Sequence, residues 1–107
     1  IRHRLGRGQV FFLAYPWEHY LAVQGPINEC DESHVLYAHL ATAAGLRPRY
    51  VSPDPRVQLR VVEDGPEDVV WVFNRSWSEI AVDLDLPGGR GLTLRPKDVR
   101  VLRVRAR

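Results

Sequence analysis

The chain has 107 residues, of which 45% are hydrophobic and 26% are charged, and its formal net charge is +2. This length allows one domain, or one small domain plus part of another, and excludes a catalytic barrel of roughly 250 residues. No apolar run approaches the roughly 20 residues of a membrane-spanning helix, so no membrane partner is expected. The single cysteine, Cys30, excludes an internal disulfide and leaves the cellular compartment open. The sequence lacks methionine and begins at Ile1 within a continuing pattern, which favours a piece of a longer protein.

Residues 1–46 are expected to form a strand followed by a helix. A glycine-rich turn at residues 6–8 leads into the apolar run 9–15, which is typical of a strand covered on both faces and stops at Pro16. A helical turn is expected over residues 17–22. The next helix should begin near Asn28 or Asp31, either of which can cap it, and should end at Gly45.

The second half of the chain has a different character. Three prolines within residues 47–56 favour an extended, stiff link. Short apolar-rich runs separated by turns then predict a small antiparallel β-sandwich over residues 57–107. The predicted fold class is therefore α+β: a strand–helix end of a flavodoxin-like domain over 1–46, a proline-rich link over 47–56 and a C-terminal β-sandwich domain over 57–107.

Residues 68–76 are predicted to hold the central strand of this sandwich. Their apolar side chains do not alternate with polar ones, which is typical of a strand covered on both faces. Val69, Trp71 and Phe73 share one side, and we expect Trp71 to lie in the core. In the last strand the apolar phase slips at Val101–Leu102, which predicts a bulge.

Few residues suggest catalysis or metal binding. A helix would place Cys30 and His34 on one face but would turn His39 away, so no metal site is expected. Glu18 and His19 follow a strand, where functional residues often lie, but they lack a paired nucleophile, and a structural role is favoured. No glycine-rich phosphate loop follows the first strand, and no cofactor is expected.

Two tryptophans are candidate sugar contacts. Trp77 follows the central strand and is either a stacking platform for a sugar ring or a side chain folded against the end of the sandwich; Trp17 is the second candidate. The C-terminal stretch is rich in arginine, but these residues interleave with valines as on an edge strand, and no recognition helix accompanies them. No nucleic-acid partner is therefore expected.

Four short patterns, taken in order, carry a family resemblance. They are RLGRGQVFFLAYPWE at residues 4–18, PDPRV at 53–57, VWVFNRSW at 70–77 and LRPKDV at 94–99. Together they resemble the C-terminal region of multidomain bacterial glycoside hydrolases of the family 42 β-galactosidase or cellulase-like type. The resemblance implies that the last strand of a flavodoxin-like domain is followed by a small β domain.

The resemblance also implies that the two catalytic glutamates of the parent enzyme lie in a barrel absent from this chain. We therefore expect a non-catalytic C-terminal segment with no catalytic residue of its own, whose partner is the remainder of the parent enzyme. The alternative is a carbohydrate-binding or protein-interaction β-module. The first strand lacks neighbours, so it either folds back with the helix over residues 28–44 onto the chain's own sandwich or pairs with a second copy. We favour a homodimer that pairs through Val10, Phe11, Phe12 and Leu13.

Overall fold

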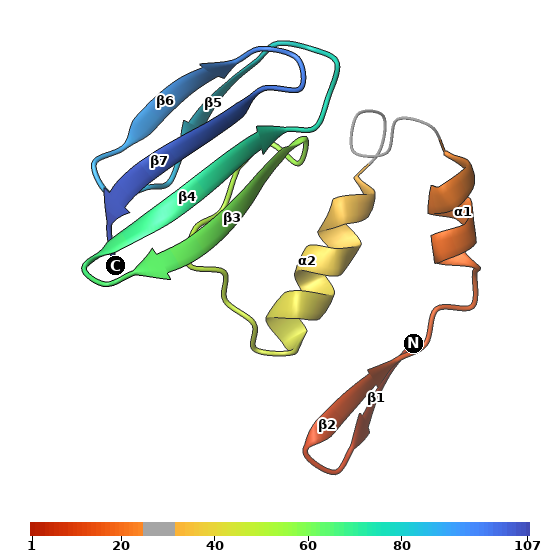
Figure 1. Cartoon of the computed structure of the whole chain (residues 1–107). Coiled ribbons are helices and arrows are strands. Elements are labelled where there is room, and N and C mark those ends of the chain that lie inside the picture. The colour runs from red at the N-terminus through yellow and green to blue at the C-terminus, as the bar shows by residue number, and fades with distance from the viewer. Residues whose placement is uncertain (25–31) are drawn as a thin grey trace. The chain divides into compact units, whose positions relative to one another are not determined.

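The computed structural model describes residues 1–24 and 32–107, which form two compact units, Ile1–Leu46 and Arg47–Arg107. Figure 1 shows the elements of both units in chain order. Among the described residues, no helix is long and apolar enough to cross a membrane.

The first unit consists of a hairpin and two helices. Strands β1 (Arg2–Leu5) and β2 (Gly8–Phe11) pair antiparallel, and Gly6 between them has a φ of 59°, a left-handed conformation that glycine adopts without steric cost. Helix α1 (Trp17–Val23) follows, as predicted, and helix α2 (Ser33–Ala43) completes the unit. The predicted helix starts at Asn28 and Asp31 lie outside the described residues. Gly45, with a φ of 78°, follows the end of α2, which confirms the predicted glycine stop.

The predicted strand over the apolar run 9–15 is wrong in its extent and its surroundings. Strand β2 ends at Phe11 and pairs with β1 of its own chain, while Val10, Phe12 and Leu13 are exposed. Phe11, which is half-buried, meets the ring of His39 edge-on, with 6.1 Å between the ring centroids. The left-handed turn at Gly6 lets residues 2–5 supply the pairing that the apolar run otherwise lacks.

The second unit is a small sandwich of two antiparallel sheets, which confirms the α+β class (Figure 1). One sheet has the order β3-β4-β7 and the other pairs β5 with β6. The strands are β3 (Val57–Asp64), β4 (Glu67–Asn74), β5 (Ile80–Leu84), β6 (Arg90–Leu94) and β7 (Val99–Arg105). The register of β4 with β7 is continuous through Val70↔Leu102 and Trp71↔Val101, so the predicted bulge at Val101–Leu102 is wrong.

The core of this unit lies between the two sheets. Its buried apolar residues come from every strand, from the segment before β3 and from the end of β5: Tyr50, Val57, Val70, Val72, Ile80, Val82, Leu84, Leu86, Leu94 and Val104. On β5 the buried and exposed residues alternate strictly, so one side of this strand faces the core and the other faces solvent. Tyr50 shows that the proline-rich segment contributes directly to the core.

The prediction for the inward face of β4 is wrong. Val70 and Val72 are fully buried, whereas Trp71 is 40% exposed on the opposite face. There its ring stacks with that of Phe73 at 6.4 Å and 14° between planes. The polar residues Asp68 and Asn74 share the inward face with the two valines, and both are anchored there by hydrogen bonds. The size and hydrophobicity of Trp71 favoured it for the core. The hydrogen bonds of Asp68 and Asn74 instead turn the face that carries Val70 and Val72 inward.

We expect truncation of a side chain in the core to lower stability more than truncation of a side chain on the outer face of β4. Leu94→Ala should lower the free energy of unfolding by about 2–5 kcal/mol, because Leu94 is fully buried and its loss leaves a cavity. Trp71→Ala should cost clearly less, since the indole remains in contact with water. Urea denaturation of both variants measures the difference. A larger loss for Trp71→Ala would mean that the outer face of β4 is covered in solution.

Candidate functional site

Trp77 lies in the turn after β4 and is 80% exposed. The Lys97 ammonium sits 4.6 Å from the centre of its ring and also donates a hydrogen bond to the Arg75 carbonyl. Lys97 has a φ of 56°, and its backbone N–H donates to the Ser76 carbonyl at 3.1 Å. One face of the indole therefore holds a cation, and a ligand could approach only the other face.

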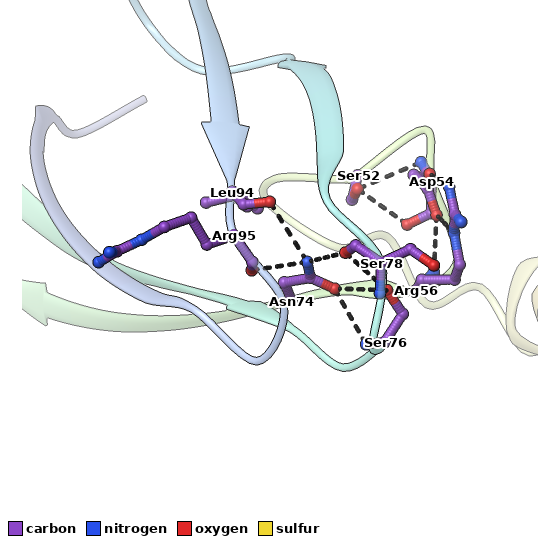
Figure 2. A network of polar contacts seen from close by, with 8 residues as sticks. All are labelled: Ser52, Asp54, Arg56, Asn74, Ser76, Ser78, Leu94 and Arg95. Carbon is purple, nitrogen blue, oxygen red and sulfur yellow. Dashed lines mark hydrogen bonds and ion pairs between the residues drawn. The ribbon is translucent and has the colours of Figure 1, made fainter.

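Asn74 organises the same end of the sandwich (Figure 2). Its side-chain amide donates to the carbonyls of Ser78 at 2.8 Å and Arg95 at 2.9 Å, with a longer contact of 3.5 Å to that of Leu94. Its side-chain oxygen accepts from the backbone N–H and the hydroxyl of Ser76, both at 2.9 Å. Asn74 and Ser76 are buried, so these bonds satisfy groups that would otherwise be costly. Residues 74–76 thus join the turn after β4 to the end of β6.

A second side-chain turn leads into β3 (Figure 2). Asp54 accepts from the Arg56 backbone N–H at 2.9 Å and pairs with the Arg56 guanidinium at 2.7 Å. The hydrogen bond from Arg56 holds the pKa of Asp54 below its usual value. The Ser52 hydroxyl closes the same turn from the other side. The PDPRV segment therefore fixes where the chain enters the sandwich.

Asp68 is a buried carboxylate at the opposite end of β4. The Tyr50 hydroxyl donates to it at 2.6 Å, and the Arg49 guanidinium lies 2.8 Å away. These two partners hold the pKa of Asp68 below its usual value, and the hydrogen bond to Asp68 raises the pKa of Tyr50. Arg49 also reaches Glu63, at 2.8 Å. Sequence reasoning missed this cluster, although a carboxylate within a buried strand face requires partners of this kind.

The first unit contains a cavity of about 370 Å³ between the two helices. Ligand sites typically measure roughly 300–1,000 Å³. The cavity is lined by Leu13, Tyr15, Pro16, Trp17, Glu18, His19, Leu36, Tyr37 and Leu40. Trp17 therefore lies in the wall of a cavity together with Glu18 and His19, which the sequence had singled out separately.

The polar part of this cavity comes from both helices. The Tyr37 hydroxyl on α2 donates a hydrogen bond to Glu18 Oε1 on α1, and this bond raises the pKa of Tyr37. Sequence reasoning did not select Tyr37. Its spacing of three residues from Leu40 places both side chains on one helix face, but that spacing does not indicate the contact with Glu18.

The described residues that line the cavity do not supply the carboxylate pair of a glycosidase. Hydrolysis of a glycosidic bond needs two carboxyl groups separated by about 5–5.5 Å or 6.5–9.5 Å. Glu18 is the one acidic residue among the described residues that line the cavity. In residues 1–24 and 32–107 no three histidine, cysteine or acidic side chains gather as metal ligands, and Cys30 lies outside these ranges.

The second unit is thus a small β-sandwich whose sequence motifs hold turns together. Residues 54–104 match the family model of the β-galactosidase C-terminal domain. No curated protein and no solved structure matches the chain. The second unit is therefore similar to the C-terminal domain of family 42-like β-galactosidases, and this match supports the resemblance of the motifs that lie within it, at residues 70–77 and 94–99.

We expect Asp68 to make the second unit sensitive to acid. Its pKa is lower in the folded state than in the unfolded state, so its contribution to stability is present above the unfolded value near 4 and is lost as the pH falls through the folded value. Urea unfolding between pH 7 and pH 2.5 measures the slope. Asp68→Asn should reduce it, whereas Asp83→Asn on the exposed side of β5 should leave it unchanged. Equal slopes in all three proteins would assign the acid sensitivity to other groups.

Proposed function

We propose that this chain is a non-catalytic C-terminal segment of a glycoside hydrolase. The two carboxylates that break the bond would lie elsewhere in the parent enzyme, in its barrel. The segment serves as a structural appendage of that enzyme, and the remainder of the parent is its first partner.

The observation that carries this proposal is that the side chains of the family motifs make hydrogen bonds within turns. Asn74 and Ser76 bond to one another and to backbone groups, and Asp54 is held by Arg56. The carboxylate of Asp98 accepts from the backbone N–H groups of Arg95 and Val99. Side chains engaged in this way stabilise turns, and they are poorly placed to act as a proton donor or nucleophile.

Carbohydrate binding is the second candidate function. The position of Trp17 in the wall of an aromatic-lined cavity favours it, because an aromatic ring beside a carboxylate can receive both the C–H face and a hydroxyl of a sugar. Trp77 supports it more weakly, since Lys97 occupies one face of its ring.

A homodimer through the first unit is a further part of the proposal. Val10, Phe12 and Leu13 are exposed, and β2 pairs with β1 along one edge, which leaves its other edge without a partner strand among the described residues. A second copy could pair there and bury Phe11 more completely.

The purified chain should not hydrolyse 4-nitrophenyl β-galactoside, because the part of the cavity that the structure describes has a single carboxylate. Release of nitrophenol is the measurement, and Glu18→Gln is the matched control. Turnover that follows protein concentration and is abolished by Glu18→Gln would contradict the proposal. Turnover that both proteins share would come from a contaminating enzyme.

Sedimentation equilibrium tests the homodimer. The chain should be dimeric at high micromolar concentration, and Phe12→Ser should shift it toward monomer because an apolar contact is removed. Val62→Ser, on the exposed face of β3, is the control and should not change the association. A strict monomer at the highest concentration would exclude pairing through β2.

A further inference from the structure

The walls of the cavity in Ile1–Leu46 are aromatic on both sides. Tyr15 and Trp17 lie edge-to-face, with 6.5 Å between their centroids and 70° between their planes. Tyr37 approaches from α2. Tyr15 is 57% and Tyr37 is 41% exposed, so both rings are accessible from solvent. The faces of such rings carry negative charge density and attract weakly positive C–H groups.

The polar edge of the cavity is an acceptor. Glu18 Oε1 accepts the hydrogen bond of Tyr37. A carboxylate has about four acceptor positions, so Glu18 retains capacity for hydroxyl donors of a ligand. The hydrogen bond to Glu18 raises the pKa of Tyr37, so the phenol remains the donor of this pair.

We propose that this cavity binds one neutral hexopyranose ring, which stacks on Tyr15 or Trp17 and donates hydroxyl hydrogen bonds to Glu18. The inference rests on the carbohydrate-binding function proposed above and assigns it to this cavity. A pyranose has one face of C–H groups and a rim of hydroxyls, which matches aromatic walls beside a single carboxylate.

The charge of Glu18 restricts the class of sugar. A uronic acid would place a second carboxylate near Glu18, and like charges in contact repel. A neutral ring therefore fits better than an acidic sugar.

Two-dimensional NMR of the full chain tests this assignment, because each tryptophan gives one indole N–H resonance. Titration with D-galactose and D-glucose should shift the Trp17 resonance with saturation and leave the Trp71 resonance in place. D-galacturonate should bind at least about tenfold more weakly than the two neutral sugars. Glu18→Gln, with its spectrum confirming the fold, should weaken the neutral sugars about tenfold and remove the discrimination against galacturonate. Trp77→Ala is the control and should leave the affinity unchanged.

Three results would overturn the inference. A saturable shift confined to Trp77 would place sugar binding in the second unit and leave the carbohydrate-binding function intact. No saturable shift with any sugar would remove both the cavity assignment and that function, while the hydrolysis assay would still judge the non-catalytic role. An equal response of Trp17 to galactose and galacturonate would show that Glu18 does not select the ligand.

Discussion

The inward face of β4 determines the arrangement of the second unit. It presents Asp68, Val70, Val72 and Asn74 in succession, so two polar residues bracket two valines that the core covers completely. Asp68 accepts hydrogen bonds from Tyr50 and Arg49, which lie in the segment before the sandwich. At the other end of β4, Asn74 donates hydrogen bonds to the carbonyls of Ser78 and Arg95. A shift of one residue would bury Trp71 but would leave four polar partners without their bonds.

This phase could not be read from β4 alone. Its apolar residues are continuous, and the usual preference for burying a large aromatic side chain selects Trp71. The elements of the sandwich were nevertheless predictable, because strict alternation in β5 and the proline and glycine turns mark them locally. Which face of β4 points inward depends instead on Tyr50 and Arg49. These residues are distant from β4 in sequence and lie in the proline-rich stretch that was predicted to be a link. Burial of a carboxylate by such partners is a tertiary property.

The first unit shows the same limit. The helix α1 and the glycine after α2 follow from local signals, but residues 2–5 have no strong strand pattern and were not expected to pair. Of the candidate site, Trp17, Glu18 and His19 could be selected from the sequence as aromatic and polar residues after a strand. Tyr37 could not, because its role depends on where α2 packs against α1, and the contact with Glu18 spans a part of the chain that carries no motif.

The location of the family motifs explains why the match to the family model says little about activity here. The matched segment, residues 54–104, contains the Asp54 turn, the Asn74 network and the Asp98 turn, each of which bonds chiefly to backbone groups or to a neighbour in its own turn. These residues stabilise turns of the sandwich, so a motif of this kind identifies the fold and does not identify a reaction. The cavity beside Trp17 lies outside the matched segment. The cavity proposed to bind a sugar therefore belongs to the unit that the family match does not cover.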